Sequence, residues 1–184
     1  MTPQECAGQP GGNAPGRPDV GFGHYLRDIV YGALDGVVTT LAVVSGATGA
    51  ALEPRIGLIL GAANLVADGV SMGASNYLGL KAELEQTGAS VAHEQPLRHG
   101  LATTAAFAVA GAVPLMAYFV PRPSGTTVFD WAAGFSTATL LLLGIVRARA
   151  AGQRPVRSAA EVLIVGALAS AAAYGIGVLA RQLV

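Results

Sequence analysis

The sequence predicts an all-α integral membrane protein with five transmembrane helices. Of its 184 residues, 52% are hydrophobic and only 12% are charged, whereas a soluble domain carries roughly a quarter charged residues. Five separate windows reach the length of about 20 apolar residues that a helix needs to cross a bilayer. They lack the alternating pattern of a membrane barrel strand, so we expect helices, which satisfy their own backbone amides.

The predicted spans carry very few charges. They are residues 29–52, 56–80, 100–120, 128–146 and 162–180. Asp35 is the one charge of the first span, Asp68 that of the second and Asp130 that of the fourth. We expect Asp130 and Glu161 in the first turns of the fourth and fifth helices, where a negative charge suits the helix dipole.

Residues 1–26 are expected to form a disordered cytoplasmic tail, and residues 27–184 the transmembrane domain. The tail is rich in proline and glycine and lacks the basic-then-apolar order of a signal peptide. Orientation follows from the basic residues, which membranes retain on the cytoplasmic face. With the amino terminus inside, that face holds Arg17, Arg27, Lys81, Arg98, Arg147, Arg149, Arg154 and Arg157, against Arg55, Arg122 and Arg181 outside. This distribution predicts a cytoplasmic amino terminus and an outside carboxyl terminus.

Three G-x-x-x-G pairs lie in the first two spans. They are Gly32 with Gly36, Gly57 with Gly61, and Gly69 with Gly73. Such pairs let helix backbones approach closely in lipid, although a chain with 25 glycines also produces some by composition alone. We expect the first two helices to pack tightly against each other or against a second copy of the chain.

Asp35 carries the strongest functional signal. A carboxylate at mid-membrane costs about 2.5 to 3.5 kcal/mol on insertion scales, so it needs a reason to be there. Asp28 precedes it by two helical turns, which places both acids on one face about 10 Å apart. Two alternatives stay open: Asp28 caps the start of its helix, and Asp35 makes a structural salt bridge or hydrogen bond.

The second span offers a polar stripe. Asn64, Asp68, Met72 and Asn76 follow at steps of four residues, which places them along one helix face. Interhelical hydrogen bonding is the structural alternative for such residues. Oxygen ligands together with a thioether suit a transition metal better than Mg2+ or Ca2+. The metal ligands predicted from both spans are Asp35, Met72, Asp28, Asn64 and Asp68.

The connection 81–99 between the second and third spans is polar. Glu83 and Glu85, with His93 and His99, either gather a cation at the cytoplasmic mouth or form only a solvated connection. Equal numbers of basic and acidic residues argue against nucleic acid as a partner. The spans contain no Ser-His pair, and no phosphate loop or nucleotide fingerprint is present. We therefore expect no enzyme and no cofactor.

Two long segments resemble a known family. RDIVYGALDGVVTTLAVVSGATGA, followed by GLILGAANLVADGVSMGASNYLGLKAELE, closely resembles the first two helices of the vacuolar iron transporter family. The later segments GAVPLMAYFV, LLLGIVRARAAG and ALASAAAYGIGVL are also similar. The likeness covers the chain from Arg27 to its end.

The resemblance implies a homodimer that carries Fe2+, and in some members Mn2+, out of the cytoplasm in exchange for protons. It implies an ion path between the two copies, lined by the first helices. By the same resemblance Asp35 of ALDG matches the principal intramembrane metal-binding aspartate. Asp28 matches an acid nearer the cytoplasm, and Met72 of SMGA matches the methionine ligand.

The sequence also departs from the family pattern. Familiar eukaryotic members insert a Glu-rich helical domain between the second and third spans, where this chain has only residues 81–99. Asn64 stands where some relatives have a carboxylate. The chain therefore resembles the shortened members of the family.

The expected function is export of Fe2+ from the cytoplasm by proton antiport, with Mn2+, Co2+ and Zn2+ as other candidate ions. The expected location is a bacterial inner (plasma) membrane. One alternative is a non-transporting membrane protein that binds metal or acts as a scaffold. Another is a proton-coupled exporter of small organic cations, although Tyr31 is the one aromatic residue near Asp35.

Overall fold

Five long helices make up the computed structural model, which describes residues 22–88, 94–121 and 123–183. They are α1 (Phe22–Gly49), α2 (Pro54–Thr87), α4 (Pro96–Leu115), α5 (Val128–Ala151) and α6 (Pro155–Leu183), with a 3-10 turn, η1 (Met116–Tyr118), after α4. All five are long and apolar enough to cross a membrane, and no strand occurs in these described ranges. The predicted all-α class with five membrane-spanning helices is confirmed.

The helices continue beyond the predicted spans. α1 begins at Phe22, inside the predicted tail, whose residues 1–21 lie outside the described residues. Only residues 152–154 separate α5 from α6, where a connection over 147–161 was predicted. The predicted spans are too short at these ends because each was stopped at the first charged residues, whereas the helices continue into the segments that carry those charges.

α2 is much longer than a membrane crossing requires. Its 34 residues extend about 50 Å at the rise of an α-helix, whereas the hydrocarbon core is about 30 Å thick. It ends at Gly88, whose φ of 66° is the left-handed conformation that commonly terminates helices. The polar residues from Lys81 to Thr87 are therefore the last helical turns of α2, and not part of a loop as predicted.

The two acids predicted to stabilise helix starts differ in position. Thr127 and Asp130 form a capping box at the start of α5, in which the Asp130 side chain accepts the Thr127 backbone N–H at 2.7 Å. Glu161, however, lies two turns into α6, because that helix begins at Pro155. The prediction for Asp130 is confirmed and that for Glu161 is wrong.

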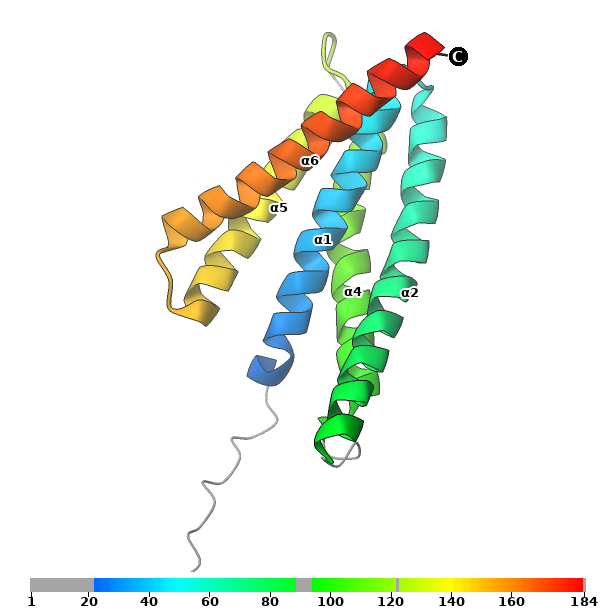
Figure 1. The fold of residues 1–184 in the computed structure, drawn as a ribbon. Helices are drawn as coiled ribbons and strands as arrows, with labels where there is room; N and C mark the ends of the chain where they lie inside the picture. The colour runs from blue at the N-terminus through cyan, green and yellow to red at the C-terminus, as the bar shows by residue number, and fades with distance from the viewer. Residues whose placement is uncertain (1–21, 89–93, 122, 184) are drawn as a thin grey trace, which may run out of the picture.

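α4 forms the support on which α1 and α2 pack. In Figure 1 α4 lies behind α1 and α2, and the α5–α6 pair lies on the other side of α1. Five of the six paired glycines in the first two helices face α4, whereas Gly57 faces Tyr118 of η1 and Ala47 of α1. A Cβ at Gly36 would overlap the backbone of Phe107, and one at Gly73 would overlap Thr104 and the Gly100 carbonyl. The predicted seam between α1 and α2, or with a second copy, is therefore wrong for the five glycines that meet α4, whereas Gly57 does lie beside Ala47 of α1.

Apolar side chains fill the contacts on both sides of α1. One cluster centres on Val44 and Leu115, with Trp131 and Tyr118 packed against it. A second centres on Val37, Leu140 and Val162. Many other large apolar side chains remain exposed along α2 and α6, as expected for helices that face lipid.

The Gly36 contact predicts a stability effect opposite to helix propensity. Alanine stabilises a helix interior by about 1 kcal/mol relative to glycine, but Gly36→Ala places a methyl group against the Phe107 backbone. We expect Gly36→Ala to lower the thermal unfolding temperature of the protein in detergent. Gly134→Ala in α5, where a Cβ meets nothing within 4 Å, is the matched control and should leave that temperature unchanged or raise it.

Candidate functional site

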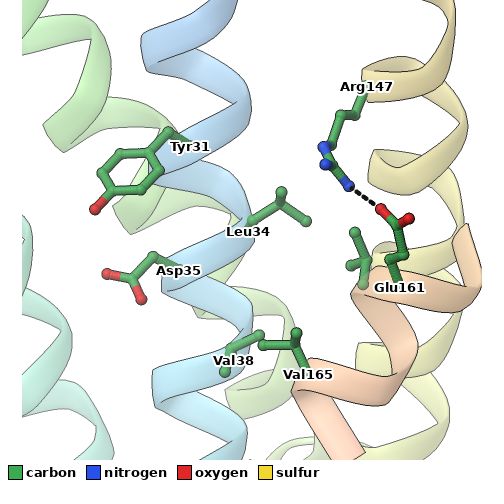
Figure 2. A pocket seen from close by; sticks show the side chains of 8 residues that line it. Tyr31, Leu34, Asp35, Val38, Arg147, Glu161 and Val165 are labelled. Carbon is green, nitrogen blue, oxygen red and sulfur yellow. Dashed lines mark hydrogen bonds and ion pairs between the residues drawn. The ribbon is translucent and has the colours of Figure 1, made fainter. Parts of the chain in front are cut away.

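Asp35 lies in the middle of α1 and is partly exposed. No hydrogen bond to its carboxylate occurs among residues 22–88, 94–121 and 123–183, whereas its backbone carbonyl accepts the Thr39 hydroxyl at 2.8 Å. Figure 2 shows Asp35 and Tyr31 projecting from the same side of α1, while Leu34 points toward the Arg147–Glu161 ion pair. Asp35 therefore presents a carboxylate without a protein partner in this part of the chain.

α2 places further oxygen atoms near Asp35. The carboxylates of Asp35 and Asp68 are close enough to repel each other. Asn64 lies one helical turn before Asp68, and its side-chain amide donates a hydrogen bond to Asp68 Oδ2 at 2.8 Å. The structure thus brings together three of the predicted ligands, Asp35, Asp68 and Asn64, and the polar stripe of α2 is present on a continuous helix.

Met72 lies beside Asp28. Both line a cavity of about 340 Å³ between α1 and α2, together with Tyr31, Ser75 and Asn76. Tyr31 also lines the cavity of about 370 Å³ that contains Asp35. Asp35 thus lines one cavity, and Asp28 and Met72 line a second cavity that shares Tyr31 with it. Asn64 and Asp68 line neither of these two cavities.

Asp28 is held in a buried network that the sequence did not predict. Its carboxylate is buried, and Nδ1 of His99 on α4 lies 2.5 Å from Oδ2. The side-chain amide of Asn76 on α2 donates to Asp28 Oδ1 at 3.0 Å and to Thr103 Oγ1 at 2.7 Å. Both Asp28 oxygens are therefore engaged, and three helices are joined at this end of the bundle.

This network corrects two interpretations. Asp28 does not cap α1, because the helix begins six residues earlier at Phe22. His99 is not part of a solvated connection, because it lies in α4 and is buried. The sequence offered one signal, the spacing of four between His99 and Thr103, whose hydroxyl donates to the His99 carbonyl at 2.9 Å. The span predicted from the sequence begins at Gly100 and not at Pro96, so the prediction did not place His99 and Thr103 on the same helix.

The predicted entrance residues lie at the far end of α2. Glu83 and Glu85 are exposed, and Glu85 makes an ion pair with Lys81 at 3.8 Å. Glu83 follows Met72 by eleven residues, which corresponds to about 16 Å along the helix. The two glutamates are thus separate from the buried groups, and His93 lies outside the described residues.

The described part of one copy of the chain holds no complete cluster of metal ligands. Among the described residues, no group of three or more His, Cys, Asp or Glu side chains could hold a metal ion together. Asp35, Asp68 and Met72 offer a sparse set that needs additional ligands for a usual coordination number.

Comparison with known proteins identifies a family. The sequence model described as the VIT family matches residues 26–96 and 86–178. A vacuolar iron transporter of Toxoplasma gondii is 27% identical over 87% of this chain and 76% of its own length. Vacuolar iron transporter 1 of Oryza sativa subsp. japonica is 24% identical over 83% of this chain and 84% of its own length. The vacuolar iron transporter of Plasmodium falciparum is 24% identical over 85% and 82% respectively.

The buried network predicts a large cost for removing His99. His99→Leu leaves the Asp28 carboxylate buried without its partner, and breaking a buried pair in this way costs about 3 to 5 kcal/mol. We expect a large loss of thermal stability in detergent. Lys81→Gln, which breaks the exposed pair with Glu85, is the control and should change stability by less than about 1 kcal/mol.

A double variant tests the cause of that loss. Asp28→Leu combined with His99→Leu removes both members of the pair, so the double variant should be more stable than His99→Leu alone. A double variant that is less stable by the sum of both single effects would contradict the pairing of Asp28 with His99.

Proposed function

The chain belongs to the VIT family, and on that premise we propose that it transports a divalent transition metal, Fe2+ and also Mn2+, out of the cytoplasm. The relatives it matches over most of its length are named vacuolar iron transporters. The observation that carries the proposal is Asp35, a carboxylate without a hydrogen-bond partner in the described chain, in the middle of a membrane-spanning helix. An acid left unpaired at that depth is expensive unless an ion or proton uses it.

The ligand chemistry favours a transition metal. Asp35 and Asp68 supply carboxylate oxygens, Asn64 supplies an amide oxygen and Met72 supplies a thioether. Thioether and imidazole ligands select transition metals, whereas Mg2+ and Ca2+ take oxygen ligands. Asp28 lines the cavity of Met72, but a metal there would compete with His99 and Asn76 for its oxygens.

The working unit in this proposal is a homodimer with the ion path at the interface. One described copy offers no complete ligand cluster, and a two-fold axis beside α1 would double the set to two Asp35 and two Met72 side chains. The face of α2 that does not meet α4 carries exposed Ile59, Val66 and Val70. Such a face can bury against a second copy as readily as against lipid.

Proton exchange follows from the same carboxylates. Acids brought together without a cation are stabilised by holding a proton between them, and an arriving metal displaces that proton. Export requires the end with α1's amino terminus to face the cytoplasm. That end also bears Arg27, Arg147 and Arg149, in accord with the retention of basic residues on the cytoplasmic side.

Removing the charge of Asp35 should abolish transport. We expect Asp35→Asn in proteoliposomes to eliminate Fe2+ uptake and the coupled proton flux, because the amide cannot exchange a proton for a metal. Asp130→Asn, which changes an acid that only caps α5, is the control and should transport normally. Fe2+ binding by the unaltered protein without flux under any pH gradient would instead support a non-transporting metal-binding protein.

Removing the Met72 sulfur should alter ion preference. Met72→Leu keeps the side-chain volume and loses the soft ligand. We expect Fe2+ uptake at low concentration to fall roughly tenfold, equivalent to about 1.4 kcal/mol of binding, with a smaller loss for Mn2+. Met116→Leu in the exposed η1 turn is the matched control. Equal uptake of both ions by Met72→Leu and the unaltered protein would contradict the assignment.

A further inference from the structure

A groove runs between α1 and the α5–α6 pair at the end of the bundle where α1 begins. It consists of two cavities of about 470 Å³ and 370 Å³ that share the lining residues Tyr31, Leu34 and Arg147. Their volumes fall in the range of ligand pockets, roughly 300 to 1,000 Å³. We call this pair of cavities the arginine groove.

The walls of the arginine groove are mostly apolar. Leu34 and Val38 of α1 oppose Val162 and Val165 of α6 in the smaller cavity, which is the cavity that also holds Asp35. Figure 2 shows Leu34 and Val165 in the space between these helices, and Asp35 projecting from another side of α1. Ala150 lines the larger cavity from α5. The groove lies among helices that cross a membrane, and hydrocarbon rather than water surrounds such walls.

Two arginines stand in this apolar groove. The Arg27 side chain is 89% exposed and its only ion-pair partner in the described chain is Asp28, at the long distance of 3.9 Å. Arg147 contacts Glu161 at 3.3 Å and the Ser158 hydroxyl at 3.5 Å, and its side chain is still 37% exposed. Each guanidinium has five N–H donors, so both retain donors for a further anion.

We propose that the arginine groove binds one anionic phospholipid, with its phosphate on Arg27 and Arg147 and an acyl chain along the apolar walls. Charge complementarity selects the headgroup, because basic pockets between membrane helices attract anionic lipids. The apolar walls select a molecule with a hydrocarbon chain over free phosphate. Two carboxylates that line the groove, Asp35 and Glu161, oppose binding because each repels an anion. Glu161 also occupies donors of the Arg147 guanidinium.

A second groove in the same chain provides an internal comparison. Its cavity of about 570 Å³ lies between α5 and α6 and is lined by Leu140, Ala167 and Tyr174 among others, but by no arginine. This cavity can accept an acyl chain without any preference for headgroup charge. Lipids that bind without a specific headgroup contact would bind both grooves with the same headgroup preference.

The test measures lipid affinity of the full chain in neutral detergent. The melting temperature is followed against phosphatidylglycerol, phosphatidylcholine with the same chains, and glycerol 3-phosphate as a headgroup without chains. Phosphatidylglycerol should stabilise the protein at lower concentration than the other two. Equal stabilisation by phosphatidylcholine would overturn the headgroup contact, and equal stabilisation by glycerol 3-phosphate would reduce the groove to a phosphate site and overturn the lipid assignment.

Charge variants give effects of opposite sign. Arg27→Gln and Arg147→Gln should each weaken phosphatidylglycerol binding about fivefold. Arg55→Gln at the other end of the bundle should not. Glu161→Gln breaks the same ion pair as Arg147→Gln but should strengthen binding, because it releases Arg147. If Arg147→Gln and Glu161→Gln weakened phosphatidylglycerol binding equally, loss of the ion pair itself would explain both results, and the proposal would fail.

Steric variants test the groove itself. Ala150→Trp fills the arginine groove and should abolish the preference for phosphatidylglycerol, whereas Ala167→Trp fills the arginine-free groove and should preserve it. If Ala150→Trp instead dissociated a dimer and left lipid preference intact, a second copy of the chain would occupy the groove, and the lipid proposal would be wrong.

Discussion

The structure depends on the close approach of α1 and α2 to the backbone of α4. Side chains are absent where these helices meet, since a Cβ at Gly36 or Gly73 would overlap α4. In lipid, where there is little hydrophobic drive between helices, van der Waals contact of this kind is a main source of association. The contact also fixes how α1 and α2 are rotated about their own axes. With their glycines on α4, α1 and α2 direct Asp35, Asp68 and Met72 to other faces.

Two acids on one face of α1 have different surroundings for this reason. Asp28 lies where three helices converge, and His99 and Asn76 engage both of its oxygens. Asp35, two turns further, lies beside cavities and faces the like charge of Asp68. A single helix therefore carries one acid whose oxygens are engaged within the bundle and one whose carboxylate has no hydrogen-bond partner among the described residues. Spacing alone placed them together but could not distinguish them.

The sequence was sufficient for the number, order and type of the helices, because hydrophobic length is a strong signal and each span is long. It also placed Asp35, Met72 and the polar stripe on the first two membrane helices, and their role as metal ligands stays a prediction. It could not identify the partner of a glycine face, since close packing on α4 and packing on a second copy require the same residues. His99 was misplaced because its helix begins at Pro96, earlier than the apolar window. Glu161 was misplaced for the same reason, since its helix begins at Pro155.

The length of α2 has a mechanical consequence. The helix is unbroken from Asn64 through Met72 to Thr87. Its outer end, Lys81 to Thr87, therefore moves together with the part of the helix that carries Met72. In the sequence, eight residues, 88–95, separate the end of α2 from the start of α4. Extra sequence inserted between α2 and α4 would be attached to the outer end of α2, and any tilt that it imposed on that end would reach Met72 through the same helix. A domain inserted between α2 and α4 would thus be connected mechanically to the helix that carries Met72, without any further change in the membrane helices.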